Sequence, residues 1–199
     1  MSQESSSIAP FERRAIFRRA LLNSLPVMMG YTTMGLAAGV LLAAKGGVEF
    51  APLWSLAIAT VCISGTLSFA LVPAIAAQEP LAAVAFLTLG INFRYAFYGF
   101  SLLGRWKDVP FFRKWFLVHS LSDEIYALDI ACRIKDPLKY GTYCLWNHAL
   151  CWLYWIVGSV AGAMAGAALP VPSNGIEFAM VALFLVILTD QLKGFSKNA

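Results

Sequence analysis

The sequence predicts an all-α integral membrane protein with about six hydrophobic segments. Of its 199 residues, 59% are hydrophobic and 13% are charged, whereas an ordinary soluble domain has about one-quarter charged residues. Uncharged runs of twenty or more residues recur along the chain, and about twenty apolar residues cross the roughly 30 Å hydrocarbon layer of a bilayer. This composition excludes a soluble globule, and its 14% aromatic residues exclude an intrinsically disordered chain.

Three of the segments contain no Asp, Glu, Lys or Arg and are the clearest predicted spans: 21–44, 51–78 and 140–176. The other three are interrupted by charged side chains: 80–104, 110–132 and 177–192. We therefore predict a disordered cytoplasmic tail at residues 1–12 and a single multi-pass membrane domain at 13–199. The domain lies in the lipid bilayer.

Basic residues give conflicting evidence about topology. Four arginines between residues 13 and 19 precede the first span, which places the amino terminus in the cytoplasm by the positive-inside rule. Two more basic clusters lie at 105–114 and 133–139, but three successive crossings would put the 105–114 cluster outside. Either one segment between Ala51 and Gly104 re-enters without crossing, or the rule fails here. The net charge of +4 reflects this topology and predicts no nucleic-acid partner.

An internal similarity suggests a repeat. Residues 17–25 and 112–121 share a Phe-basic-basic sequence followed by Ser-Leu, with one gap. If the similarity is real, the chain consists of two inverted three-segment halves, 13–104 and 105–199, with a re-entrant or broken helix among their segments. The alternative is a chance similarity between two basic borders.

The cysteines favour packing over metal binding. The four cysteines lack the paired CxxC spacing of zinc or redox sites. Cys144, His148 and Cys151 share one helix face, where soft ligands could bind a metal. We favour small apolar cysteines beside a hydrogen-bonded histidine, and we predict no metal and no cofactor.

Small residues predict where helices approach closely. Gly35 and Gly39 form a GxxxG pair, and the same spacing recurs at residues 158, 162 and 166, so these strips are predicted packing faces. Pro26 and Gly30 could bend or unwind the first span, because proline removes a helical hydrogen bond.

Arg94 is the most informative residue at membrane depth. An arginine in mid-membrane costs about 2.5–3.5 kcal/mol even on the lower scale, so Arg94 should face a cavity or a carboxylate. The candidate carboxylates are Asp123 and Glu124, with His119 one helical turn before Asp123. Such a pair could also serve only to fix helix register. A different class of function, an integral membrane enzyme or metal-dependent hydrolase using His119, Asp123 and Glu124, lacks the HExxH and GxSxG motifs.

Several motifs together resemble the AzlC-type branched-chain amino acid permeases, over nearly the whole chain. They lie at residues 25–39, 64–69, 91–99, 122–124 and 188–193. The chain departs from the family pattern at Ser68, where glutamine is usual, and at Tyr95, where histidine is common. It also ends at Ala199, where family members usually continue with another apolar segment.

The resemblance implies a secondary active transporter and not an enzyme. The expected protein is a multi-pass protein of the cell inner membrane that exports branched-chain amino acids, with methionine as a further candidate. It would be the large subunit beside a small AzlD-type membrane partner. Proton coupling is expected because adjacent carboxylates repel each other, which favours a proton on one of them. The expected substrate-binding residues are Asn92, Arg94, Ser68, Gly65, Pro26 and Gly30, and the expected proton-coupling residues are Asp123 and Glu124.

Overall fold

The computed structural model describes residues 8–168, and all of its regular elements are helices. This confirms the predicted all-α class. The predicted segment at 177–192, the end of the 140–176 segment, the motif at 188–193 and residues 1–7 of the predicted tail lie outside the described residues. The first helix begins at Pro10, so residues 10–12 of the predicted 1–12 tail are helical.

Three of the described helices are long and apolar enough to cross a membrane: α1 (Pro10–Lys45), α4 (Leu81–Leu103) and α7 (Pro137–Ala168). Four shorter helices lie between them: α2 (Ala51–Val61), α3 (Gly65–Ala76), α5 (Phe111–His119) and α6 (Asp123–Ala131). At about 1.5 Å per residue, each short helix reaches only about half-way through a bilayer.

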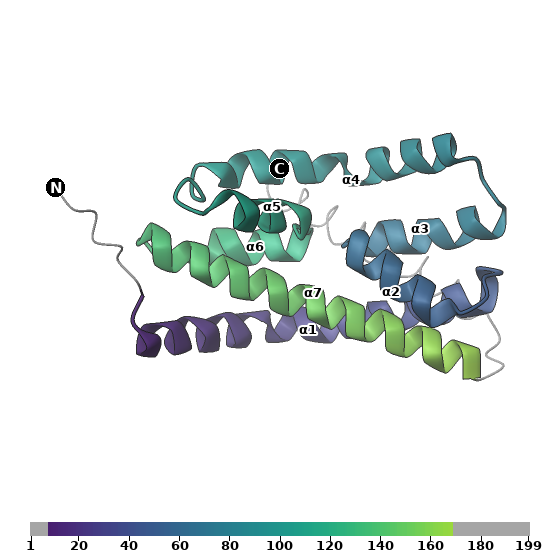
Figure 1. The fold of residues 1–199 in the computed structure, drawn as a ribbon, viewed down its shortest axis with the longest axis horizontal. Helices are drawn as coiled ribbons and strands as arrows, with labels where there is room; N and C mark the ends of the chain where they lie inside the picture. Colours follow the sequence, from purple (N-terminus) through teal and green to yellow (C-terminus); the bar gives the residue numbers. More distant parts are fainter. Residues whose placement is uncertain (1–7, 169–199) are drawn as a thin grey trace, which may run out of the picture.

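The short helices form two hairpins that enter from opposite ends of the protein (Figure 1). The first hairpin, α2 and α3, starts and finishes at the end where α1 finishes. The second hairpin, α5 and α6, starts and finishes at the end where α1 begins. Their inner ends touch, because a ring nitrogen of His119 lies 3.3 Å from the carbonyl oxygen of Thr60. The hairpins therefore meet inside the protein.

The predicted single span at 51–78 is wrong. The structure shows instead the alternative that the sequence left open, in which this segment re-enters without crossing. The helix stops at Val61, and Ser64 caps a new helix by accepting a hydrogen bond at Oγ from the Leu67 N–H. The predicted 110–132 segment is broken in the same way, with Ser122 Oγ accepting from the Ile125 N–H. A serine cap satisfies an N–H that the first turn of a helix would otherwise leave unpaired.

Re-entry removes the topological conflict. Because the first hairpin returns to its own end, α4 carries residues 105–114 back to the end where α1 begins (Figure 1). The start of α7 lies there too, since Lys139 forms an ion pair with Glu12 of α1. All three basic clusters therefore gather at one end of the described structure.

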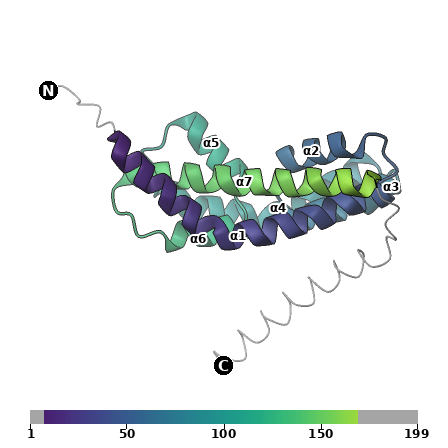
Figure 2. The same ribbon diagram turned by 90° about the horizontal axis from the view of Figure 1, so that it is seen from below.

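The core of the fold is the contact between α1 and α7, which run in the same direction (Figure 2). A Cβ added to Gly35 would lie 2.8 Å from the backbone nitrogen of Ser159, and one added to Gly158 would lie 2.8 Å from the carbonyl oxygen of Thr32. The predicted glycine packing faces are confirmed. Helix α1 changes direction along its length (Figure 2) and contains Pro26, the ordinary cause of such a bend, but it stays helical throughout.

Candidate functional site

The two hairpin turns bring polar and charged side chains together beside the middle of α1 and α4. We call this cluster the central junction. Its members are Tyr31, Ser64, Arg94, Tyr95, Ser122, Asp123 and Glu124. Polar groups at this depth are costly in lipid and usually serve a substrate or ion pathway.

Arg94 pairs with Asp123, as its depth in the segment predicted. Its Nη1 lies 3.0 Å from Asp123 Oδ2, and both side chains are about two-fifths exposed in the described structure, at 42% and 40%. Arg94 also donates from Nη2 to the Tyr95 hydroxyl at 3.3 Å and lies over that ring. The pair is thus held in place yet open on one side, so another charged group could approach it.

Glu124 ties the second hairpin to α1. Its Oε2 accepts hydrogen bonds from the Tyr31 hydroxyl at 2.9 Å and from Ser122 Oγ at 3.1 Å, and the two hydroxyls also contact each other. On the other side of the junction, the Tyr95 hydroxyl donates to Ser64 Oγ at 3.3 Å, which ties the first hairpin to α4. Each hairpin turn is therefore fastened to a long helix by one tyrosine.

Helix ends add partial charges to the junction. Helices α3 and α6 begin there, and their amino ends carry the positive end of the helix dipole. Helices α2 and α5 finish there with their negative ends. Broken helices that point their ends at the middle of the membrane are a recurring way to bind small charged solutes in transporters.

Two other predicted site residues lie in or near the first hairpin turn. Gly65 follows the capping Ser64, and a Cβ there would lie 3.1 Å from the end of the Met34 side chain. Ser68, one turn further, lines a cavity of about 20 Å³ together with Ser159 of α7, and neither hydroxyl has a hydrogen-bond partner among the described residues. This cavity has about the volume of one water site.

The remaining predicted residues differ in their surroundings. Asn92 lies on α4 two residues before Arg94, and its buried Oδ1 has no hydrogen-bond partner among residues 8–168. Pro26 and Gly30 stay within α1, where a Cβ on Gly30 would meet nothing described within 4 Å. The structure therefore groups Arg94 with Asp123, and Glu124 beside them, but shows no unwound backbone at Pro26 or Gly30.

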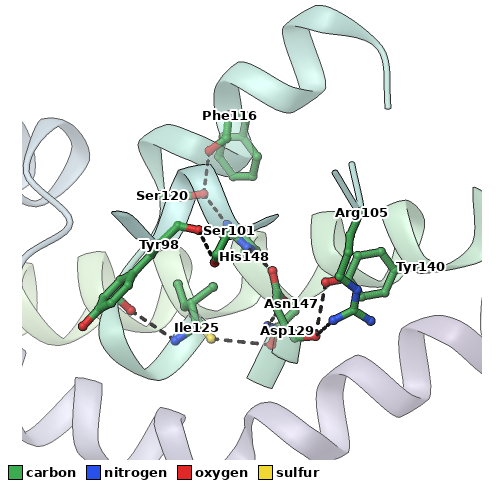
Figure 3. A network of polar contacts seen from close by, with 12 residues as sticks. Tyr98, Ser101, Arg105, Phe116, Ser120, Ile125, Asp129, Tyr140, Asn147 and His148 are labelled. Atoms are coloured by element: carbon green, nitrogen blue, oxygen red, sulfur yellow. Dashed lines mark hydrogen bonds and ion pairs between the residues drawn. The ribbon is translucent and has the colours of Figure 1, made fainter. Parts of the chain in front are cut away.

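The sequence predicted a hydrogen-bonded His148 but not the second polar cluster to which it belongs, which is fully buried and is drawn in Figure 3. A carboxylate oxygen of Asp129 lies 2.9 Å from His148 Nε2, and its other oxygen accepts from Asn147 Nδ2 at 3.1 Å. His148 Nδ1 lies 2.8 Å from Ser120 Oγ. Asp129 could have been suspected as a third acid in the 110–132 segment, and His148 as the one ionisable imidazole in the 140–176 run. Their pairing is not visible in the sequence.

The candidate metal and enzyme sites are not assembled in the described part of the chain. His148 of the Cys144–His148–Cys151 face bonds to Asp129 and Ser120, and no group of three or more metal-binding side chains occurs among residues 8–168. His119 stacks on Trp115 and contacts Thr60 of the first hairpin. Asp123 and Glu124 are instead engaged by Arg94 and Tyr31.

Comparison with known proteins identifies the family. The sequence model of the family described as AzlC protein matches residues 26–169, which is well over half of the chain. The chain belongs to the AzlC family. The family resemblance inferred from the motifs is thereby confirmed.

Curated relatives of this AzlC-family chain are membrane proteins. An uncharacterized membrane protein of Haemophilus influenzae is 30% identical over 100% of the chain and 80% of the relative. The branched-chain amino acid transport protein AzlC of Bacillus subtilis is 27% identical over 89% of the chain and 68% of the relative. The inner membrane protein YgaZ of Escherichia coli is 25% identical over 93% of the chain and 77% of the relative. No solved structure matches the chain.

Membership in the AzlC family decides between the classes of function considered from the sequence. The chain is a membrane transport protein and not an enzyme. The hydrolase alternative built on His119, Asp123 and Glu124 is therefore set aside. This agrees with the structure, in which each of these three side chains contacts different partners.

Proposed function

We propose that this protein exports branched-chain amino acids, and methionine as a further substrate, by exchange with protons. The observation that carries the proposal is the Arg94–Asp123 pair beside Glu124, placed where both hairpin turns meet the long helices. The Bacillus subtilis relative is named for branched-chain amino acid transport, which supports this substrate class.

The junction has the groups that a zwitterionic amino acid needs. The substrate carboxylate binds Arg94 and the amino ends of α3 and α6, because these are the positive groups of the site. The substrate ammonium binds Asp123 or Glu124. Asn92, whose Oδ1 has no partner in the described part of the chain, and Ser68 are neutral hydrogen-bonding groups, and Gly65 leaves room for close approach at the first hairpin turn. Pro26 bends α1, and Gly30 leaves the surface of that part of the helix without a side chain.

Proton coupling is assigned to the two adjacent carboxylates. In the structure Arg94 already neutralises Asp123, while the donors to Glu124 among residues 8–168 are the hydroxyls of Tyr31 and Ser122. In the empty site a proton on Glu124 relieves the repulsion between the adjacent carboxylates; when a substrate binds, its carboxylate takes over Arg94 and its ammonium supplies that positive charge, so the proton leaves. Competition between this proton and the substrate ammonium makes the exchange an antiport.

Export also needs a defined orientation. The end that gathers the three basic clusters is assigned to the cytoplasm by the positive-inside rule. The first hairpin then enters from outside and the second from the cytoplasm. The Escherichia coli relative is named as an inner membrane protein, which supports the cell inner membrane as the location.

A small AzlD-type membrane subunit is the proposed partner. Large apolar side chains on α4 are more than half exposed in the described structure: Phe86, Leu89, Phe93, Phe97 and Phe100. Arg94 and Asp123 are also partly exposed, and a charged pair facing lipid would be costly. A protein partner over α4 would cover both features.

The test is efflux of isoleucine from dipeptide-loaded cells that express Arg94→Ala, Asp123→Asn or Glu124→Gln at wild-type membrane abundance. We expect each variant to lose at least nine-tenths of wild-type efflux, about 1.4 kcal/mol or more. Asp108→Asn is the matched control, because Asp108 is exposed in the loop after α4. The assay is run with and without the candidate small subunit. Wild-type efflux in all three site variants would end the proposal.

A further inference from the structure

The buried cluster around Asp129 and His148 has no role in the substrate site just proposed. Both side chains are fully buried, and they join α6 of the second hairpin to α7 (Figure 3). An ionisable pair in the interior of a membrane protein is expensive to keep, and such pairs commonly lie on proton pathways. The pair therefore carries an energetic cost that an ordinary apolar packing contact between α6 and α7 would avoid.

The hydrogen-bond network determines where the protons lie. The Ser120 hydroxyl has one hydrogen, which it donates to the Phe116 carbonyl oxygen at 2.6 Å. Its Oγ must then accept from His148 Nδ1, so Nδ1 carries a hydrogen. A second proton must lie between His148 Nε2 and Asp129 Oδ2, because two bare lone pairs at 2.9 Å would repel.

We propose that the Asp129–His148 pair is a second proton site of the transporter, holding one proton while the second hairpin packs against α7. With that proton the pair is neutral overall, as an imidazolium with a carboxylate or as an imidazole with a carboxylic acid. Release of the proton to water leaves a neutral imidazole facing a carboxylate, and the contact loses its hydrogen bond. Proton release therefore weakens the packing of the hairpin against α7, and separation of the hairpin from α7 favours proton release.

Among residues 8–168, the other groups around the pair do not supply a substitute counter-charge to the Asp129 carboxylate. From the loop after α4, Arg105 donates to the main-chain oxygens of Asp129 and Cys132, and Trp106 packs its ring edge-on against His148. From α7, the Tyr140 hydroxyl donates to the same Asp129 main-chain oxygen. Further titratable or charged groups of the described chain near this region are Arg19 of α1, Glu124 of α6, and Tyr143, Cys144 and Cys151 of α7.

The turn of the second hairpin links this pair to the central junction. Ser120, at one side of the turn, bonds to His148, whereas Ser122, two residues later, bonds to Tyr31 and Glu124. A movement of the turn away from α7 therefore acts on the group that binds the substrate. Release of the proton from the Asp129–His148 pair thus affects substrate binding through movement of the hairpin turn, in addition to direct competition at Glu124.

The inference rests on the proposed function, and one experiment separates the two. The full chain, with its small partner where efflux requires it, is placed in liposomes containing the pH dye pyranine. Leucine counterflow is measured at equal pH, and the proton movement driven by leucine is measured from the dye. Asp129→Asn is compared with Asp108→Asn, an aspartate outside the cluster. We expect Asp129→Asn to keep counterflow while moving less than half the protons per leucine.

The possible results have different meanings. Wild-type protein without counterflow, or with counterflow but no proton movement, overturns the proposed proton-coupled function and this inference with it. An active wild type and an Asp129→Asn variant with an unchanged proton-to-leucine ratio overturn the inference alone.

A spectroscopic measurement decides the case in which Asp129→Asn loses counterflow as well. The chain has 2 histidines, so ¹⁵N-histidine spectra of the wild-type protein in liposomes are simple, and comparison with His148→Gln assigns the signals. We expect His148 Nδ1 to keep its hydrogen while Nε2 loses its proton when the liposomes are moved from acidic to alkaline buffer. An Nε2 signal that is the same in both buffers overturns the inference.

Discussion

Replacing Gly39 by alanine tests the contact between α1 and α7 that holds the hairpins in place. A Cβ at position 39 would lie 2.5 Å from the Ala163 backbone nitrogen and 2.9 Å from the Gly162 carbonyl carbon, well inside ordinary contact at 3.4 Å. It would also collide with the Ser159 carbonyl oxygen. Backbone atoms cannot rotate away as a side chain can, so the two helices must separate by about 1 Å.

The cost follows from the lost contacts. A gap of about 0.5–1 Å forfeits roughly a quarter to a half of each atom–atom dispersion contact, which is worth about 0.1–0.2 kcal/mol. Over roughly 40 such contacts, at about 0.15 kcal/mol each, the loss is about 1.5–3 kcal/mol. Overpacking in protein cores costs a similar amount, about 1–3 kcal/mol. For a chain of this length, that loss lowers the melting temperature by roughly 3–12 °C.

The assay is thermal unfolding of the purified protein in detergent, followed by the fluorescence of its 6 tryptophans. Gly30→Ala is the matched control, because it makes the same chemical change in the same helix where a Cβ meets nothing described within 4 Å. Alanine favours helix over glycine by about 0.5–1 kcal/mol, so this control should melt at or slightly above the wild-type temperature. If Gly39→Ala has the same melting temperature as Gly30→Ala, the close approach of the two helices is not what stabilises the fold.

Three further predictions follow from individual contacts. Tyr31→Phe removes a hydrogen bond to the Glu124 carboxylate worth about 1.5–3 kcal/mol, so isoleucine efflux should fall at least tenfold, and efflux within twofold of wild type would contradict the role of that contact. A cysteine in place of Lys107, at the end that gathers the basic clusters, should react with a membrane-impermeant maleimide only from the cytoplasmic side; labelling of intact cells from outside would reverse the proposed orientation. Lys139→Gln removes a partly exposed ion pair with Glu12 and should leave the melting temperature unchanged, because ion pairs at the surface contribute little; a clear drop would show that this pair holds the ends of α1 and α7 together.

Local chemistry along the chain determined much of the fold. The long apolar runs predicted the membrane crossings of α1, α4 and α7, because the length of a run sets whether it can span a bilayer. The glycine spacing predicted the packing faces of α1 and α7, because residues four apart share a helix face. The cost of an arginine at membrane depth predicted that Arg94 faces a cavity or a carboxylate, and in the structure it pairs with Asp123. Each of these inferences needed only spacing and transfer energies within a segment.

Only the tertiary structure showed that the two apolar segments at 51–78 and 110–132 are hairpins. Ser64 and Ser122 are capping residues that could begin a helix, but a serine inside an apolar run does not reveal whether the chain continues or turns back. The turns are set by contacts with distant partners, such as the one between His119 and Thr60. The pairing of Asp129 with His148 depends in the same way on α6 packing against α7, since the two residues are 19 positions apart in different helices. Hydropathy is a local property, whereas such pairings exist only once the helices have packed together.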